Sequence, residues 1–189
     1  VPILFNNTVT GKNVSLVVKK TELYKALNVI HGEIFGVSKK INIAVFGHGL
    51  VGGTLINQIL ESAEAIDERK HIKLNVFAIA NSKKILLNKN GVTSNWKNEI
   101  ENNGISYSFE DVIAYANEHH LENLIAIDNT ASAAFVENYI PLVESSFDLI
   151  SSNKVANTLS YGFYKDLRKS LADNQKNYLY ETSVGAGLP

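Results

Sequence analysis

The sequence predicts an α/β protein with a Rossmann-like, doubly wound parallel sheet, preceded by a strand and a helix of another domain. Two observations support this. From residue 41 onward short apolar strands alternate with amphipathic helices, and the first of these strands ends in a glycine-rich turn that opens a helix. Repeated strand–helix–strand units with apolar strands are typical of a parallel sheet covered on both faces. A length of 189 residues suits one ordinary domain plus a fragment of a second.

Composition excludes several classes of protein. The chain has no cysteine, which excludes disulfide scaffolds, thiolate nucleophiles and cysteine metal sites. A net charge of −1 predicts no nucleic-acid or anionic-membrane partner. No apolar run is long enough to span a bilayer, and the first residues lack the basic stretch of a signal peptide. We therefore expect a cytoplasmic protein that acts on a small molecule.

Residues 1–36 are expected to be the C-terminal part of a neighbouring domain. Val14, Leu16 and Val18 alternate with other residues as in a strand, and Thr21 stands where the N-cap of a helix over 21–35 belongs. One strand and one helix cannot enclose a core. The chain begins without methionine and stops just after a glycine-rich loop, so we expect a piece of a longer polypeptide, with residues 37–189 forming the sheet domain.

Five strands and five helices are predicted after the linker at 36–40. The expected strands are 41–46, 73–80, 124–128, 147–150 and 178–180. The expected helices are 54–65, 94–103, 109–119, 133–144 and 160–172.

The glycine-rich turn fits the pattern G-x-G-x-x-G with Gly47, Gly49 and Gly52. After a buried strand and before a helix, this pattern is typical of a dinucleotide-binding turn. Gly47 permits the tight turn, Gly49 lets the backbone approach a pyrophosphate, and Gly52 lets the helix pack against the strand. The alternative is a strand-to-helix turn without a ligand.

The end of the second strand is where the adenosine ribose is read. Here it carries Ala80, Asn81 and Ser82, followed by Lys83 and Lys84, with no carboxylate to bind a 2′-hydroxyl or repel a 2′-phosphate. NADP is therefore tolerated beside NAD, and the two lysines favour it. The two lysines are equally compatible with a solvated loop.

Two further loops follow predicted strands. Thr130 and Ser132 lie after the strand ending at 128, and Asn153 and Lys154 lie after the strand ending at 150. In open α/β sheets ligands bind in the crevice outside such strand ends. Thr130 and Ser132 also suit a helix cap. Lys154 suits an anionic substrate, with a solvated surface lysine as the alternative.

Five segments together resemble homoserine dehydrogenase. They are GHGLVGG, AIANSKK, DNTAS, SSNKVANT and YLYETSVGAGLP, in this order, and the last is the most distinctive. The segment at 13–35 resembles the last strand and helix of an ACT regulatory domain. That domain precedes the dehydrogenase in bifunctional aspartokinase/homoserine dehydrogenases.

The resemblance implies NAD(P)H-dependent interconversion of L-aspartate 4-semialdehyde and L-homoserine, by a homo-oligomeric parent enzyme that also carries aspartate kinase. It places the pyrophosphate at Gly49, Leu50, Val51 and Gly52. It places the adenosine ribose by the turn at 80–82, the nicotinamide by Thr130 and Ser132, and cofactor and substrate by Asn153 and Lys154. Many relatives have a second basic residue where this chain has Val155.

The resemblance also implies a sodium site in the glycine-rich terminus. Its ligands would be Glu181 and main-chain oxygens of Val184, Ala186 and Leu188, since such oxygens suit a hard cation. The alternative is that this segment is only a bend leaving the domain.

The catalytic lysine and the substrate-binding carboxylates of the family lie downstream of Pro189. We therefore expect the chain to bind dinucleotide without turning over substrate. Two other functions stay open: a non-catalytic dinucleotide-sensing module, and a dehydrogenase acting on another semialdehyde. The sequence does not decide between NAD and NADP, nor the oligomeric state.

Overall fold

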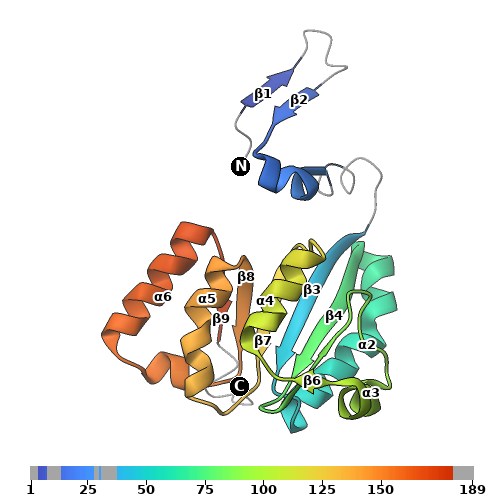
Figure 1. Ribbon diagram of the computed structural model, residues 1–189, viewed down its shortest axis with the longest axis vertical. Helices are drawn as coiled ribbons and strands as arrows, with labels where there is room; N and C mark the ends of the chain where they lie inside the picture. The colour runs from blue at the N-terminus through green and yellow to red at the C-terminus, as the bar shows by residue number, and fades with distance from the viewer. Residues whose placement is uncertain (1–3, 8–13, 28–29, 31–37, 181–189) are drawn as a thin grey trace. The chain divides into compact units, whose positions relative to one another are not determined.

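The computed structural model describes residues 4–7, 14–27, 30 and 38–180 (Figure 1). The chain divides into two compact units, Val1–Lys39 and Lys40–Pro189.

The first unit contains a two-stranded antiparallel sheet. Strand β1 (Leu4–Asn7) pairs with β2 (Val14–Val17), and the 3₁₀ turn η1 (Lys20–Glu22) follows. The strand predicted at 14–18 is confirmed, whereas β1 was missed because only two of its residues are apolar. The N-cap predicted at Thr21 is wrong, since the helical turn already begins after Lys19.

The described helical part of this unit exposes three large hydrophobic side chains. Residues 23–27 are helical, and Leu23, Tyr24 and Leu27 are exposed. Most of the remainder of the helix predicted over 21–35 lies outside the described residues. The derivation of residues 1–36 from a regulatory domain stays a prediction.

The second unit is built on a seven-stranded sheet, with strand order β6-β5-β4-β3-β7-β8-β9. The strands are β3 (Lys39–Phe46), β4 (Ile72–Ala80), β5 (Lys84–Leu87), β6 (Ile105–Ser106), β7 (Leu124–Asp128), β8 (Phe147–Ser151) and β9 (Tyr178–Leu179). Strands β3, β7, β8 and β9 form parallel pairs in that order. The arrows of β3 and β4 point the same way in Figure 1. The predicted parallel sheet is thus confirmed for these five strands.

Strands β5 and β6 were not predicted; β5 pairs antiparallel with β4, and β6 pairs antiparallel with β5. After β4 the chain turns back at once instead of crossing over through a helix. Asn81 holds this turn, because its Oδ1 accepts hydrogen bonds from the backbone N–H groups of Lys83 and Lys84, each at 2.7 Å. An all-parallel sheet is therefore wrong at this edge.

Helices cover both faces of the sheet, as the alternating pattern predicts. The helices are α2 (Leu50–Lys70), α3 (Trp96–Asn103), α4 (Phe109–Glu118), α5 (Tyr139–Glu144) and α6 (Tyr161–Asn174), with 3₁₀ turns η2 (Ala134–Asn138) and η3 (Val155–Thr158). One buried cluster joins Ile43 and Val45 of β3 to α2 and α3. The other joins Ala44 and Phe46 to α4, α5 and α6. Successive residues of β3 thus enter opposite cores. Among the described helices, none is long and apolar enough to cross a membrane.

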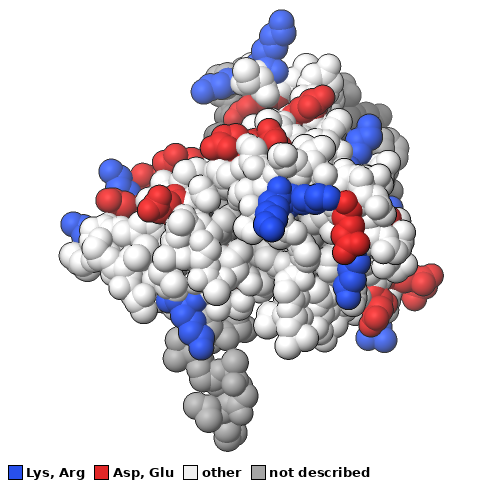
Figure 2. All heavy atoms as spheres, turned by 60° about the horizontal axis from the view of Figure 1, so that its bottom comes forward, with Lys and Arg blue, Asp and Glu red and all other residues white. Residues whose placement is uncertain are grey.

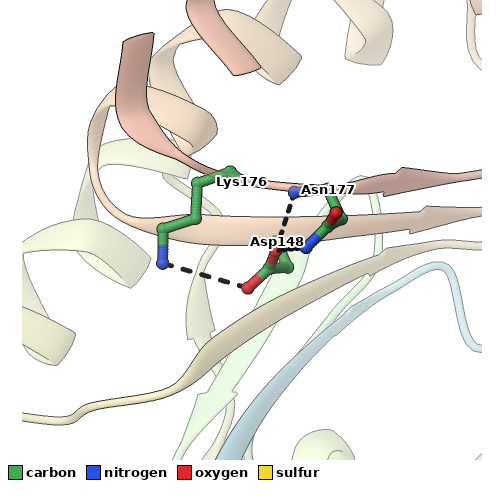
Figure 3. Close-up of polar contacts among 3 residues, drawn as sticks. All are labelled: Asp148, Lys176 and Asn177. Atoms are coloured by element: carbon green, nitrogen blue, oxygen red, sulfur yellow. Dashed lines mark hydrogen bonds and ion pairs between the residues drawn. The ribbon is translucent and has the colours of Figure 1, made fainter. Parts of the chain in front are cut away.

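A polar contact fixes the last strand at the sheet edge (Figure 3). Asp148 on β8 accepts a hydrogen bond from the backbone N–H of Asn177 at 2.8 Å, and its other carboxylate oxygen lies 3.9 Å from Nζ of Lys176. These contacts start β9 beside β8, so that Tyr178 packs into the core.

The order of the strands creates a topological switch point. From β3 the chain passes through α2 to β4 on one side, and later returns as β7 on the other side of β3. The carboxyl ends of β3 and β7 therefore border the crevice where ligands bind in open α/β sheets.

Candidate functional site

The glycine turn joins β3 to α2, and two of its glycines are closely packed against backbone atoms. Gly47 has a φ of +85°, and its N–H donates a hydrogen bond to the carbonyl of Ala80 at 2.8 Å. A Cβ at Gly47 would lie 2.9 Å from the carbonyl oxygen of Asn129, and one at Gly52 would lie 1.9 Å from the carbonyl oxygen of Gly47. The structural roles predicted for these two glycines are confirmed.

Gly49 lies in open space, in contrast to Gly47 and Gly52. A Cβ there would meet no heavy atom within 4 Å. Gly49 is the N-cap of α2 and offers no side-chain hydrogen bond to the first turn, which also has no acidic residue. The first backbone N–H groups of a helix have no intrahelical acceptor, and they stand at the positive end of its dipole. Over its 21 residues, α2 thus presents an uncapped N-terminus suited to an anion.

A cavity of about 860 Å³ opens beside this turn, within the range of small-molecule sites. The residues that line it are Phe46, Gly47, His48, Gly49, Ala80, Asn81, Ser82, Tyr107, Thr130, Ala131, Ser132, Ala134, Phe135 and Asn138. Seven residues predicted from the sequence are thereby brought together: Gly47, Gly49, Ala80, Asn81, Ser82, Thr130 and Ser132. On the face of the molecule in Figure 2, basic and acidic side chains are interspersed, and most of the surface between them is uncharged.

Five predicted residues do not line the cavity. Leu50 and Val51 stand in the first turn of α2 with their side chains exposed, and Gly52 is buried beneath it. Asn153 is buried behind the loop that follows β7, and Lys154 is exposed. The first three can still offer backbone N–H groups, whereas Asn153 has a positioning role.

Asp128, at the end of β7, is the centre of a buried polar network that the sequence did not single out. Its Oδ1 accepts a hydrogen bond from the backbone N–H of Thr130 at 2.8 Å. Its Oδ2 accepts hydrogen bonds from the Tyr139 hydroxyl at 2.7 Å and from Nδ2 of Asn153 at 3.1 Å. The carboxylate is 2% exposed, so three donors compensate its desolvation. It ties the loop after β7 to α5 and to the loop after β8.

Asn153 extends this network to the wall of the cavity. Its Nδ2 also donates to the carbonyl of Ser132 at 3.0 Å, and its Oδ1 accepts from the N–H of Val155. The Ser132 hydroxyl accepts a hydrogen bond from the N–H of Phe135, although the N-cap of the following turn η2 is Ala133 and not Ser132. The Thr130 hydroxyl in turn accepts a hydrogen bond from the N–H of Ser132, so both hydroxyl residues predicted here have a structural role and border the cavity.

Three tyrosines near the site have raised pKa values. Burial raises the pKa of Tyr107 to about 12, with smaller effects from the charges of Glu110 and Asp128. Burial, followed by the charge of Asp128, raises the pKa of Tyr139, and burial raises that of Tyr178. Tyr139 therefore stays a hydrogen-bond donor to Asp128 throughout the physiological range.

These raised pKa values predict a loss of stability at alkaline pH. Above about pH 10 the unfolded chain releases phenolic protons that the folded chain retains, so the free energy of unfolding falls as pH rises from about 10 to 12. The three tyrosines make no such contribution below about pH 9. Urea unfolding at pH 8, 9, 10 and 11 measures this decline, which Tyr139→Phe should make shallower. An equal decline in the variant would contradict the assignment of Tyr139.

The sodium site predicted at Glu181, Val184, Ala186 and Leu188 lies outside the described residues. Within the described ranges, no group of three histidine, aspartate or glutamate side chains is placed to hold a metal ion. The sodium site stays a prediction.

The switch-point crevice, the uncapped helix and the adjoining cavity define the second unit as a Rossmann-type nucleotide-binding domain. Comparison with known families identifies it further. The family model described as "Homoserine dehydrogenase, NAD binding domain" matches residues 47–181. The chain belongs to this family.

Curated relatives agree with this assignment. The chain is 40% identical over 179 residues to a bifunctional aspartokinase/homoserine dehydrogenase of Buchnera aphidicola, covering 94% of this chain and 22% of that protein. It is 33% identical to the Haemophilus influenzae protein of the same name, with the same coverage. The chain thus spans about a fifth of the length of these curated relatives.

The solved structures establish the fold. Homoserine dehydrogenase from Thermoplasma acidophilum has a TM-score of 0.61 and 22% identity, covering 80% of this chain and 46% of that one. A hyperthermophilic archaeal homoserine dehydrogenase in complex with NADPH has a TM-score of 0.57 and 21% identity, covering 77% of this chain and 44% of that one.

Proposed function

We propose that this chain is the NAD(P)-binding part of a homoserine dehydrogenase, which interconverts L-aspartate 4-semialdehyde and L-homoserine. The observation that carries the proposal is the uncapped N-terminus of α2 beside a cavity at the switch point of the sheet. The family match favours this enzyme over a non-catalytic sensing module and over a dehydrogenase for another semialdehyde. The names of the relatives support a parent polypeptide that also carries aspartokinase.

The geometry supports a specific division of labour in this proposal. The backbone N–H groups of Gly49, Leu50, Val51 and Gly52 hold the pyrophosphate, and the turn at 80–82 contacts the adenosine ribose. Thr130 and Ser132 border the nicotinamide end, where the bound cofactor supplies a hydride. Lys154 would arrange substrate, with its exposed side chain at the end of the loop after β8. Sodium binding, a homo-oligomeric parent and a cytoplasmic location complete the proposal.

Titration of the purified chain with NADPH and with NADH tests the proposal. We expect saturable binding to one site by calorimetry, with a rise in the unfolding temperature. At a free ligand concentration of 100 times Kd the added stability is about 2.7 kcal/mol. The Gly49→Val variant is the matched control. Its binding should be weaker, because the valine side chain would fill the space at the N-cap of α2. Absence of binding by both nucleotides would overturn the proposal.

Activity should be absent from the isolated chain even when cofactor binds. Hydride transfer needs a proton donor and groups that orient the substrate, which the family resemblance places downstream of Pro189. Incubation with NADPH and aspartate semialdehyde should show no loss of NADPH absorbance above the protein-free rate. Turnover by the 189-residue chain would contradict this assignment of the catalytic residues.

A further inference from the structure

His48 and Asn81 form a wall shared by two hollows at the carboxyl end of the sheet. Both residues line the large cavity of about 860 Å³ and a smaller hollow of about 270 Å³. His48 belongs to the glycine turn after β3, and Asn81 follows β4. The other residues of the smaller hollow are Lys84, Trp96, Lys97, Ile100 and Glu101.

The contact between the two residues fixes which atoms carry hydrogens. Nδ2 of Asn81 and Nε2 of His48 are 2.9 Å apart. The Oδ1 atom of Asn81 already accepts the two backbone N–H groups of residues 83 and 84, which orients the amide with its nitrogen toward His48. Since an amide nitrogen only donates, Nε2 of His48 must accept. His48 is therefore a neutral imidazole with its hydrogen on Nδ1.

The smaller hollow carries an excess of positive charge. Its lining contains two lysines against one carboxylate, that of Glu101. Nζ of Lys84 donates a hydrogen bond to the carbonyl of Glu101, and Nζ of Lys97 lies 5.5 Å from the ring centroid of Trp96. Trp96 in turn packs edge-on against His48, with ring centroids 5.5 Å apart. The large cavity adds only Tyr107 as a further titratable lining residue.

We propose that His48 takes up a proton when the bound dinucleotide carries a 2′-phosphate, and that it thereby selects NADPH over NADH. This inference rests on the proposed function of the cavity. The end of β4 is where the adenosine ribose is read, so its 2′ substituent comes against the His48–Asn81 wall. With a 2′-hydroxyl, Nε2 of neutral His48 goes on accepting the hydrogen bond from Asn81, so His48 needs no proton.

A 2′-phosphate requires His48 to donate a hydrogen bond instead of accepting one. A phosphate monoester carries a charge between about −1.5 and −2 at pH 7, and its three terminal oxygens are strong hydrogen-bond acceptors. A lone pair on Nε2 repels it, whereas a protonated ring donates to it. The proton comes from solvent, Asn81 is freed to donate its Nδ2 hydrogens to the same phosphate, and Lys84 and Lys97 add attraction.

Proton uptake is measurable by calorimetry of the purified chain in buffers of different ionisation enthalpy at pH 7.5. We expect the apparent enthalpy of NADPH binding to vary with the buffer, with up to one proton taken up, and the enthalpy of NADH binding to be independent of it. The affinity for NADPH should also fall as pH rises from 6.5 to 8.5, relative to the affinity for NADH.

The variant His48→Gln tests the role of the proton alone. A glutamine carboxamide oxygen still accepts a hydrogen bond from Asn81 but cannot be protonated at neutral pH. Loss of one charged hydrogen bond predicts a decrease in the NADPH to NADH affinity ratio of roughly tenfold or more. Lys70→Ala is the control, since it removes a positive charge at the opposite end of α2 and should change neither affinity.

The outcomes separate this inference from the proposed function. If both nucleotides bind but proton uptake is equal for the two, the role of His48 is overturned while the dinucleotide site stands. An unchanged affinity ratio in His48→Gln has the same meaning. If neither nucleotide binds the unaltered chain, the proposed function and this inference are both overturned.

Discussion

The substitution Gly52→Ala is expected to destabilise the second unit by about 3 kcal/mol or more and to abolish dinucleotide binding. The added Cβ would lie 1.9 Å from the carbonyl oxygen of Gly47. This oxygen belongs to the backbone of a tight turn that is itself packed against Asn129. Because no flexible side chain can move aside, α2 must shift away from β3 and expose part of the core that contains Ile56. Overpacking of this kind costs about 1–3 kcal/mol, and more where backbone cannot move aside.

Thermal unfolding measures this effect, with an expected decrease of roughly 6–12 °C for a chain of this size. Gly49→Ala is the matched control, because nothing lies within 4 Å of its Cβ position. It should unfold close to the temperature of the unaltered chain and lose only cofactor affinity. Equal unfolding temperatures for Gly52→Ala and Gly49→Ala would show that the geometry of the turn is wrong.

The second large effect is expected from Asp128→Ala. This change removes the acceptor of the Tyr139 hydroxyl, the Asn153 amide and the N–H of Thr130. Each buried donor left unpaired costs about 1–3 kcal/mol, and relaxation or entering water recovers part of this. We expect a net loss of about 2–5 kcal/mol in the free energy of unfolding.

Urea unfolding of a small series tests the role of Asp128. Asp128→Asn keeps the size and one acceptor oxygen, so its loss should be intermediate between those of the unaltered chain and Asp128→Ala. Asp166→Ala, at an exposed position on α6, should stay within about 0.5 kcal/mol. A loss of that small size in Asp128→Ala would contradict a structural role for the network.

The elements that were predicted well are those whose residues repeat a local pattern. The alternation of Ile43 and Val45 with Ala44 and Phe46 indicates a strand buried on both faces, and the structure places these residues in two separate cores. The glycine turn was equally predictable, because its requirements arise within a few residues of chain. The length of α2 was underestimated at both ends; at its start the reason is that Gly52 and Gly53 have low helix propensity but lie inside the first turn.

The features that were missed depend on contacts between distant segments. Strand β5 has four residues, and its antiparallel direction depends on how Asn81 holds the preceding turn. The network of Asp128 joins residues 11 and 25 positions apart, for which the sequence gives no periodic signal. The same network explains why Asn153 lies behind the cavity wall, although its place after β8 suggested contact with a ligand.

The central claim is that the backbone N–H groups at the start of α2 bind the pyrophosphate of a nicotinamide dinucleotide. Backbone amide NMR of the ¹⁵N-labelled chain during titration with NADPH tests it most directly. We predict that the largest shift changes fall on the amides of Gly49, Leu50, Val51 and Gly52, with smaller changes at Asn81 and Thr130. Binding of NADPH that leaves these four amides unchanged while others shift would contradict the claim.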